Sequence, residues 1–341
     1  MRAAIFNPYL DTLGGGERYT MAFAQALVAN GYSVFVQWPN TLIKKKLEQR
    51  FGIKLDGVEF IKDIKRGDGY DICFWVSDGS IPLLRAHKNF LHFQTPFKDV
   101  DGKSLLNRMK LFRIDKIICN SYFTKGFIDE EYAVKSLVIY PPVAVGKIRP
   151  GGKENIILNV GRFSQLQQAK RQDVLISAFK QLFNEGVLDW KLILAGGTEI
   201  GVDYYIEKLR KAVKDYPIQI IESPTFAEIK DLYGKAKIFW AATGFGIEEK
   251  RSPMGVEHFG ITLVEAMSGG AVPIAYCAGG HKEIIADGDN GYLWRKKREL
   301  LAKTRQLIAN ERLWKSLSSK AKKDSRVYEY ERFEAEIAGI I

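Results

Sequence analysis

Two glutamates that flank a short glycine-bearing segment are the residues of this chain best suited to bind a ligand. Glu257 lies just before Phe259-Gly260-Ile261, and Glu265 follows about one turn into a helix predicted to begin near Thr262. Backbone amides at a helix N-terminus lack a partner within the helix and favour anions or hydroxyl oxygens. Each carboxylate can accept a pair of hydroxyl hydrogens. The pattern therefore predicts a site for a ligand with several hydroxyl groups, in preference to two unrelated surface charges.

Two other motifs suggest chemistry that the rest of the sequence does not support. Asp287-Gly288-Asp289 has the D-x-D spelling of metal-dependent transferases, but it lies in a turn-forming segment, and Gly291 stands where a calcium loop needs a ligand. Gly14-Gly15-Gly16 lacks the third glycine of a dinucleotide fingerprint, whose place Tyr19 takes, and no P-loop lysine follows. We therefore expect no bound metal, no nicotinamide cofactor and no hydrolysis of nucleoside triphosphates.

The elements that position these residues alternate between strand and helix along the chain. A strand, a glycine turn and a helix with one apolar face (Arg18–Asn30) open the sequence, and a similar series later contains a helix at Asp173–Asn184. The predicted strands are Arg2–Phe6, Ser33–Trp38, Ile72–Val76, Phe90–Phe93, Lys116–Asn120, Leu137–Tyr140, Ile156–Val160, Lys191–Ala195, Ile218–Ile221, Ile238–Ala241 and Val272–Ala275. Such alternation predicts an α/β fold with parallel sheets, in two Rossmann-like domains.

A break in this pattern separates the two series. Pro141-Pro142 and Arg149-Pro150-Gly151-Gly152 interrupt the periodicity and predict an interdomain linker. We place an N-terminal domain at 1–146, a second domain at 153–323, and a C-terminal helix at 324–341 that packs back on the first domain. The two domains are expected to face a central cleft, because ligands of open parallel sheets bind outside the carboxyl ends of the strands.

Composition narrows the classes of protein to which the chain can belong. It has 341 residues, of which 46% are hydrophobic and 27% charged, and the sequence shows neither a membrane-spanning run nor a signal peptide. Cys73, Cys119 and Cys277 lie in apolar stretches without C-x-x-C spacing, which predicts buried reduced thiols and a cytoplasmic protein. The net charge is +11, and residues 1–150 carry an excess of seven cations. This charge suits a polyphosphate ligand or anionic lipid, while the motifs of sequence-specific nucleic-acid binding are missing.

Taken in order, several motifs resemble those of family 4-type retaining glycosyltransferases of GT-B architecture, over nearly the whole chain. The two glutamates around Phe-Gly-Ile resemble the donor-site motif of that family, and Glu257–Ile261 is similar to the corresponding segment of dolichol-pathway mannosyltransferases and related bacterial enzymes. The other matching segments are Gly14–Glu17, Asn120–Thr124, Tyr140–Val143, Val160–Arg162 with Lys170, Ala278–Glu283 and Asp287–Leu293.

The resemblance implies a role for each matching residue of the second domain. Arg162 and Lys170 would neutralise the donor diphosphate, in agreement with the affinity of guanidinium and ammonium groups for phosphate oxygens. Ser164–Ala169 makes the gap between them longer than in many members, so Arg171 is an alternative to Lys170. Glu265 would hold the ribose. The transferred sugar and the rest of the donor would be bound by Glu257, Phe259, Gly260, Ile261 and Thr262.

The resemblance also implies roles in the first domain. Gly14, Gly15 and Gly16 would let the backbone approach the donor phosphates. His92 ends a predicted strand and would hydrogen-bond the sugar or the acceptor, with a satisfied core residue as the alternative. Asp78 ends another strand, where an acceptor contact and a turn are equally open interpretations.

These roles together imply a retaining hexosyltransferase that moves a sugar from a nucleotide-sugar donor to a glycan or lipid-linked acceptor, with neither a metal nor a cofactor. GDP-mannose is the first expectation for the donor, ahead of UDP-hexoses. The alternatives are a nucleotide-sugar epimerase of GT-B fold and a non-catalytic basic module that binds lipid or nucleic acid. Turnover of the donor distinguishes the three.

Two segments, Leu42–Phe51 and Lys103–Lys116, mix apolar and basic residues at helical spacing. In the second segment, apolar residues lie opposite basic residues on the predicted helix. The apolar residues are Leu105, Leu106, Met109 and Phe112, and the basic residues are Lys103, Arg108, Lys110 and Arg113. Such a helix either docks on a sheet or contacts a membrane. We expect peripheral contact of the first domain with an anionic membrane, on the inner face.

Overall fold

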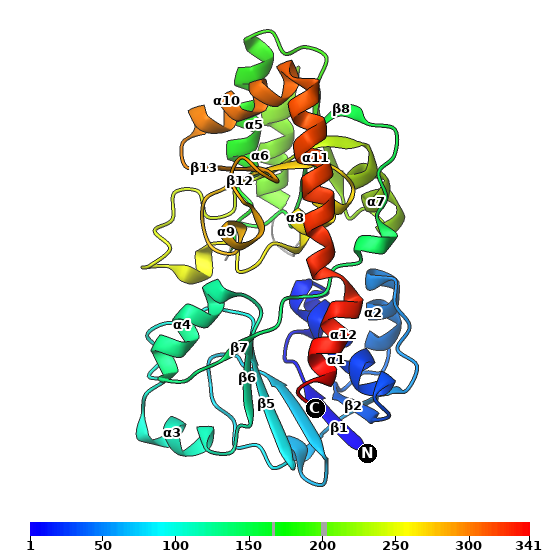
Figure 1. Ribbon diagram of the computed structural model, residues 1–341, viewed down its shortest axis with the longest axis vertical. Helices are drawn as coiled ribbons and strands as arrows, with labels where there is room; N and C mark the ends of the chain where they lie inside the picture. The colour runs from blue at the N-terminus through cyan, green and yellow to red at the C-terminus, as the bar shows by residue number, and fades with distance from the viewer. Residues whose placement is uncertain (166–167, 199–202) are drawn as a thin grey trace. The chain divides into compact units, whose positions relative to one another are not determined.

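The alternation of strand and helix builds two parallel sheets, each in its own unit of the chain (Figure 1). The computed structural model describes residues 1–165, 168–198 and 203–341. Unit 1 comprises Met1–Pro142 and Tyr330–Ile341, and unit 2 comprises Val143–Glu329. The expected α/β fold class is confirmed.

The sheet of unit 1 has seven strands in the order β3-β2-β1-β4-β5-β6-β7, and every described pairing is parallel. The strands are β1 (Arg2–Phe6), β2 (Ser33–Gln37), β3 (Val58–Ile61), β4 (Ile72–Val76), β5 (Lys88–Phe93), β6 (Lys116–Cys119) and β7 (Leu137–Val138). The sequence missed β3, a short edge strand whose burial alternates. The expected strand at Leu137–Tyr140 is shorter than predicted and ends at Val138, although the Ile139 N–H still donates to the Cys119 carbonyl at 3.1 Å.

Five helices accompany this sheet in the described part of unit 1: α1 (Gly15–Ala29), α2 (Ile43–Phe51), α3 (Leu105–Leu111), α4 (Tyr122–Tyr132) and α12 (Tyr330–Ala338). The last helix, α12, lies against α1 near the start of the chain (Figure 1). Its Phe333 and Ile337 are fully buried in the same apolar cluster as the α1 side chains. The predicted start of the first helix at Arg18 is wrong, because Gly15 and Gly16 already belong to α1.

The sheet of unit 2 has six parallel strands in the order β10-β9-β8-β11-β12-β13. They are β8 (Glu154–Val160), β9 (Lys191–Gly196), β10 (Ile218–Glu222), β11 (Ala236–Ala241), β12 (Val272–Tyr276) and β13 (Tyr292–Trp294). The sequence missed β13, whose three residues follow a Gly- and Asp-rich turn. In both sheets the strand order reverses beside the first strand, which is the Rossmann arrangement.

The helices of unit 2 are α5 (Gln172–Asn184), α6 (Asp203–Val213), α7 (Phe226–Lys235), α8 (Ile261–Ser268), α9 (His281–Ile284), α10 (Lys297–Ala309) and α11 (Glu311–Ser325). Helix α8 packs on β11 and β12, and α11 covers α8. Two fully buried tryptophans fill the core without leaving their indole N–H groups unsatisfied. Trp240 donates to Thr304 Oγ1 at 3.1 Å, and Trp294 donates to the Ala241 carbonyl at 3.2 Å.

The three cysteines are free thiols. Cys73 and Cys119 are buried, and burial raises the pKa of each to about 12. Cys277 is only half-buried, so the expectation of three buried thiols is wrong for this residue. Among the described residues, no helix is both long and apolar enough to cross a membrane.

Candidate functional site

The strand order of unit 2 brings several predicted site residues to one edge of its sheet. Strands β8, β11 and β12 are parallel neighbours, so their carboxyl ends lie at the same edge. Arg162 follows β8, the loop with Glu257 follows β11, and Gly279-Gly280 follows β12. The strand order reverses between β8 and β11, and open α/β sheets bind ligands at such switch points. This edge is the candidate site of unit 2.

Lys170 and Glu257 form an ion pair at this edge. The distance between Lys170 Nζ and Glu257 Oε2 is 2.7 Å, and the two side chains are 16% and 15% exposed. Burial alone would raise the pKa of Glu257, but Lys170, with further contributions from His281 and His258, lowers it to about 2. Glu257 is therefore a carboxylate at physiological pH, and it accepts hydrogen bonds without acting as a proton donor.

Arg171, the alternative to Lys170 in the sequence, makes a different set of contacts. Its guanidinium pairs with the Asp173 carboxylate at 3.1 Å and donates to the Phe245 carbonyl at 2.7 Å. Its backbone has a φ of 51°, in the left-handed region, where the chain direction changes sharply. The structure thus brings Lys170, and not Arg171, to Glu257.

Arg162 lies directly after β8, at the start of the segment that leads to Lys170. Its side chain is exposed, and its carbonyl accepts a hydrogen bond from Gln172 Nε2 at 3.0 Å. This bond fixes the backbone at the end of β8 to the first turn of α5. Within the Ser164–Ala169 gap, residues 166 and 167 lie outside the described residues.

The loop that carries Glu257 packs closely on the turn after β12. The Gly280 N–H donates to the Glu257 carbonyl at 2.8 Å. Gly279 has a φ of 55°, and a Cβ at this position would overlap the same carbonyl oxygen. Glycine is therefore required at 279 by both its backbone conformation and its contact.

Two residues to which the sequence assigned no role hold this turn in place. The Glu249 carboxylate accepts the Gly279 N–H at 3.0 Å and pairs with Lys282 Nζ at 2.6 Å. His281 is 1% exposed, and its Nδ1 donates to the Tyr276 carbonyl at 2.8 Å. His281 stood in a matching segment, whereas Glu249 belongs to no motif, so no signal in the sequence could have found it.

Glu265 lies inside α8 with its side chain buried, at 4% exposure. One carboxylate oxygen accepts a hydrogen bond from the Tyr233 hydroxyl at 2.8 Å, across from α7. The predicted helix start near Thr262 is close to the observed one, since α8 begins at Ile261 with Gly260 as its N-cap. The N–H groups of Leu263 and Val264 donate to the Gly260 carbonyl at 3.0 and 3.3 Å, whereas the helix supplies no carbonyl for the N–H groups of Ile261 and Thr262. A helix N-terminus thus follows Glu257 closely in the chain, and its use as an anion or hydroxyl site stays a prediction.

Substitution of Gly279 by alanine tests how tightly the turn and the Glu257 loop depend on each other. Gly288 is a matched control, because its φ of 84° is also left-handed but a Cβ there would meet nothing within 4 Å. We expect Gly288→Ala to lower the free energy of unfolding by about 1 kcal/mol, the strain of a left-handed alanine. Gly279→Ala should lower it by at least ~2 kcal/mol, because overpacking adds to that strain. Urea unfolding of both variants measures the difference, and equal losses would contradict the proposed contact.

In unit 1 the predicted glycine segment lies at the start of α1. The Gly14 N–H and the Thr12 hydroxyl both donate to the Glu17 carboxylate, each at 2.7 Å, so Glu17 caps its own helix. A Cβ at Gly16 would overlap the side-chain amide of Gln94, which follows β5. The segment is therefore a close backbone approach between α1 and the carboxyl end of β5.

His92 is fully buried at the end of β5. Its ring stacks on Tyr19 with a centroid distance of 4.2 Å, and Nδ1 donates to the Ile118 carbonyl at 3.1 Å. Burial lowers the pKa of His92 to about 3, so the imidazole is neutral. Because Nδ1 carries the proton, Nε2 is an acceptor, and it has no hydrogen-bond partner among the described residues. His92 thus combines a core position with one unsatisfied acceptor.

The aspartates of the remaining motifs take part in turns and surface ion pairs. Asp78 accepts hydrogen bonds from both the N–H and the hydroxyl of Ser80, which supports the turn interpretation. Asp287 accepts the Leu293 N–H at 2.8 Å and pairs with Lys303, and Asp289 pairs with Lys320. Within the described ranges, no group of three or more His, Cys, Asp or Glu side chains is arranged to hold a metal ion.

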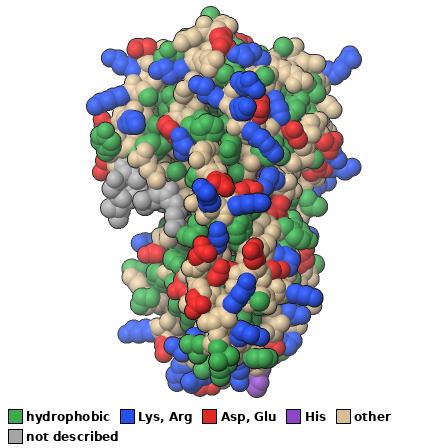
Figure 2. Space-filling view, turned by 90° about the vertical axis from the view of Figure 1, so that its left-hand side faces the viewer, with side chains coloured by type: hydrophobic (Ala, Val, Ile, Leu, Met, Phe, Trp, Pro, Cys, Tyr) green, Lys and Arg blue, Asp and Glu red, His purple; other side chains and the backbone are tan. Residues whose placement is uncertain are grey.

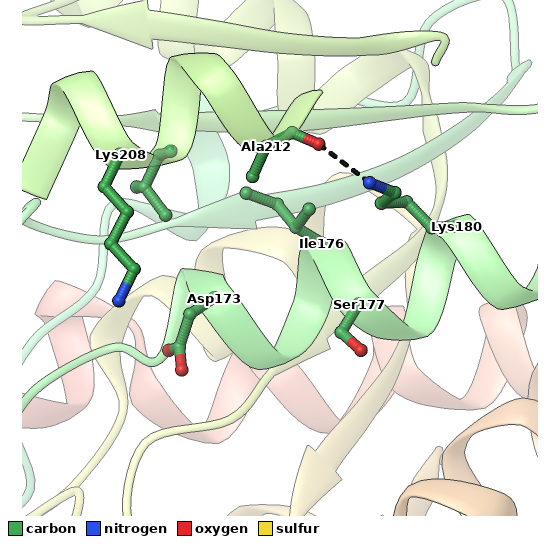
Figure 3. A pocket seen from close by; sticks show the side chains of 7 residues that line it. Asp173, Ile176, Ser177, Lys180, Lys208 and Ala212 are labelled. Carbon is green, nitrogen blue, oxygen red and sulfur yellow. Dashed lines mark hydrogen bonds between the residues drawn. The ribbon is translucent and has the colours of Figure 1, made fainter. Parts of the chain in front are cut away.

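A groove between α5 and α6 is a separate feature of unit 2 (Figure 3). Asp173 and Lys208 lie toward one end, and Lys180 donates to the Ala212 carbonyl at 3.2 Å. None of the predicted site residues lines the groove, so it is not the candidate site.

The sequence matches the family described as "Glycosyl transferases group 1" over residues 145–324. An uncharacterized glycosyltransferase of Methanocaldococcus jannaschii is 31% identical over 221 residues, which cover 64% of this chain and 56% of the relative. The human GDP-Man:Man(3)GlcNAc(2)-PP-Dol alpha-1,2-mannosyltransferase is 28% identical over 236 residues, which cover 61% of this chain and 44% of the relative. The chain spans about half the length of these curated relatives.

Solved structures resemble this fold along the whole chain. HepE of Anabaena in complex with UDP has a TM-score of 0.78 at 18% identity, with 99% of each chain covered. Sucrose-phosphate synthase of Thermosynechococcus elongatus has a TM-score of 0.73 at 15% identity, with 99% of this chain and 98% of that chain covered. At these identities the likeness concerns the fold alone, and it confirms the expected GT-B architecture of two Rossmann-like domains.

Proposed function

Since the chain belongs to the group 1 glycosyl transferases, we propose that it transfers a hexose from a nucleotide-sugar donor to a glycan or lipid-linked acceptor. The observation that carries this proposal is the Lys170–Glu257 pair at the switch point of unit 2, beside the first turn of α8. An ammonium group suits phosphate oxygens, a carboxylate suits hydroxyl groups, and a helix N-terminus suits either. A nucleotide-sugar presents all of these groups in one molecule.

Arg162 and Lys170 act on the leaving diphosphate. An ammonium group has three N–H donors, so Lys170 can keep its bond to Glu257 while it binds a phosphate oxygen. Arg162 adds a guanidinium fork from the exposed end of β8. Negative charge on the diphosphate grows as its bond to the sugar breaks, and two fixed cations stabilise that charge without a metal ion.

Glu257 binds the hydroxyl groups of the transferred sugar, together with the backbone of Phe259, Gly260 and Ile261. Because its pKa is lowered to about 2, its negative charge persists during the reaction. A fixed carboxylate near the sugar also stabilises the positive charge that the ring gains as the bond at C1 breaks. Glu265, held by Tyr233, binds the ribose.

The transfer step forms a bond from the acceptor oxygen to C1 of the sugar and breaks the bond from C1 to the diphosphate oxygen. We propose that the acceptor attacks from the face that the diphosphate leaves, so the configuration at C1 is retained. The proton of the acceptor hydroxyl then passes to the leaving phosphate. His92 assists by accepting a hydrogen bond at Nε2 from a hydroxyl group of sugar or acceptor, since its pKa of about 3 makes it a poor base.

GDP-mannose is the proposed donor, because curated relatives of several species are named as GDP-mannose-dependent mannosyltransferases. UDP-hexoses are the second candidates, because HepE of Anabaena was solved with UDP and with UDP-glucose. A thermal-shift panel of GDP, UDP and ADP sugars separates these donors. The preferred donor should then release its nucleoside diphosphate only when an acceptor is present. An epimerase would instead alter the sugar without an acceptor, and absence of any donor binding would refute the proposal.

Activity is expected to be independent of divalent metal ions. Lys170 and Arg162 supply the positive charge that a metal would otherwise provide, and the Asp287 and Asp289 carboxylates are paired with lysines. Turnover of the preferred donor should be the same with and without EDTA. Loss of activity in EDTA, with recovery on addition of Mn²⁺ or Mg²⁺, would contradict the assigned role of the two cations.

A further inference from the structure

Helices α2 and α3 come from the two segments that mix apolar and basic residues. In α3, unlike α2, most of the apolar side chains lie on the surface. In α2, the apolar residues Ile43, Leu47 and Phe51 are 5% exposed or less and belong to the core of unit 1. None of the seven residues of α3 is buried. Leu105, Leu106, Met109 and the C-cap residue Phe112 are 74%, 62%, 60% and 90% exposed. The structure therefore separates two segments that look alike in the sequence.

The exposed side chains of α3 form one stripe with cations on both sides. Successive residues of a helix are rotated by about 100°, which places Leu105, Leu106, Met109 and Phe112 on one face. Arg108 and Lys110 fall on opposite borders of that face by the same rotation. Figure 2 views the side of unit 1 that carries α3 and shows hydrophobic side chains bordered by lysine and arginine side chains toward the lower end. Residues 103–116 contain five cations and a single carboxylate, Asp115.

The helix is held firmly in this outward position. The Glu131 carboxylate on α4 accepts three backbone N–H groups from the segment before α3, those of Asp99, Val100 and Gly102, at 2.9 to 3.1 Å. On the opposite face of α3, Leu111 packs against the buried cluster of unit 1. The apolar stripe is therefore presented by a fixed element.

We propose that α3 is the surface by which unit 1 docks on an anionic lipid bilayer. An apolar stripe bordered by cations matches an interface in which acyl chains lie beneath anionic headgroups. A second copy of the chain is a poorer match, because a self-paired surface would bring Arg108 and Lys110 of two copies together. Four apolar side chains on a short helix bind only weakly by themselves, so the anionic headgroups are needed as well. The inference does not depend on the transfer reaction, since docking requires no donor.

Vesicle sedimentation of the full chain tests this surface. We expect binding to vesicles of phosphatidylcholine and phosphatidylglycerol in equal parts, no binding to phosphatidylcholine alone, and weaker binding as salt increases. Leu106→Gln/Phe112→Gln should lower the partition coefficient on the order of tenfold or more, because it removes two of the four apolar side chains that docking would bury. Arg108→Gln/Lys110→Gln should lower it similarly and reduce its dependence on salt.

Matched variants on α2 control for exposure and charge. Leu42 is 66% exposed, and Lys45 and Lys46 are exposed, but the apolar face of α2 is already buried. We therefore expect vesicle binding to stay within about twofold of the wild type in Leu42→Gln and in Lys45→Gln/Lys46→Gln. A twofold change in the partition coefficient corresponds to a binding free energy of under ~0.5 kcal/mol, the usual range for a surface substitution. The substituted side chains are exposed, except that of Lys110, which is half-buried, so thermal midpoints should change little. Calorimetry with the nucleoside diphosphate checks the site of unit 2 separately.

Three results would overturn the proposal. The first is unchanged vesicle binding by both α3 variants, and the second is an equal loss in the α2 variants. The third is a dimer in sedimentation velocity that Leu106→Gln/Phe112→Gln dissociates, with no vesicle binding by the wild type, which would make α3 a self-association surface. Wild-type protein that binds vesicles but no nucleoside diphosphate would refute the proposed function and leave the docking surface intact.

Discussion

Arg162→Ala is expected to lower turnover by at least ~10²-fold, the effect of losing one donor of positive charge to a transition state. The physical reason is that Arg162 and Lys170 are proposed to bind the donor diphosphate, whose negative charge grows as its bond to the sugar breaks. The Arg162 side chain is exposed at the end of β8, so its removal should leave the stability of the protein nearly unchanged. A steady-state assay with the preferred donor, together with a thermal midpoint, measures both quantities.

Arg251 provides the matched control for this substitution. It is an arginine of the same unit with 82% side-chain exposure, paired with Glu248 on the surface. Arg251→Ala removes the same charge from unit 2 and should leave turnover within about twofold, as expected for a highly exposed side chain to which no part in binding the donor is assigned. If Arg162→Ala retains wild-type rates, or if both variants lose activity equally, the assignment of the phosphate site to the end of β8 is wrong.

The second large effect is a difference between Glu257→Gln and Glu265→Gln. Glu265 is proposed to bind the ribose, which does not react, so its loss removes binding that ground state and transition state share. Glu257 is proposed to face the sugar ring, whose positive charge develops only as the reaction proceeds. Uniform binding is lost mainly in KM, whereas binding that strengthens in the transition state is lost in kcat. We therefore expect Glu265→Gln to raise KM for the donor and Glu257→Gln to lower kcat, on the order of 10²-fold.

Calorimetry with the nucleoside diphosphate alone separates the two variants without knowledge of the acceptor. Glu265→Gln should weaken binding, and Tyr233→Phe should weaken it in the same direction, because the Tyr233 hydroxyl holds the Glu265 carboxylate at 2.8 Å. Glu257→Gln should leave affinity undiminished, since Lys170, which is proposed to bind the diphosphate, then lacks its present counter-ion. Loss of nucleotide affinity in Glu257→Gln, with full affinity in Glu265→Gln, would reverse the placement of the two carboxylates.

The sequence predicted the order of the elements well because its periodicity reports which side of each strand and helix is buried. The predicted parallel sheets led to the expectation that ligands bind outside the carboxyl ends of the strands. The assignment of Arg162 and Lys170 to the same site as Glu257 came instead from the resemblance to the glycosyltransferase family. Two short strands were missed, β3 with four residues and β13 with three, because so few residues show too little of a periodic pattern. The start of α1 was placed too late because Gly15 and Gly16 are poor helix formers, and here the capping carboxylate of Glu17 and the close contact with Gln94 outweigh that propensity.

The site details that the sequence left open depend on backbone direction and on long-range contacts. Lys170 and Arg171 are equivalent as a pattern, but the left-handed backbone of Arg171 sends the two side chains to different partners. Glu249 is separated from Gly279 by 30 residues, and only the packing of two loops reveals that it holds the turn. Likewise, the spacing of α2 and α3 is alike, and burial alone distinguishes them.

Because α12 belongs to unit 1, the two units are not completed in the order in which they begin along the chain. Unit 2 is one continuous stretch, whereas unit 1 consists of Met1–Pro142 and Tyr330–Ile341, with all of unit 2 between them. During synthesis, unit 2 is therefore complete before the cluster around α1 receives Phe333 and Ile337. Until then, the apolar surface of α1 that Phe333 and Ile337 cover stays exposed to solvent. Unit 1 must also bring α12 back across the length of unit 2, and closing so long a loop costs conformational entropy. Nascent chains that stop before residue 330 should thus depend more on chaperones for unit 1 than for unit 2.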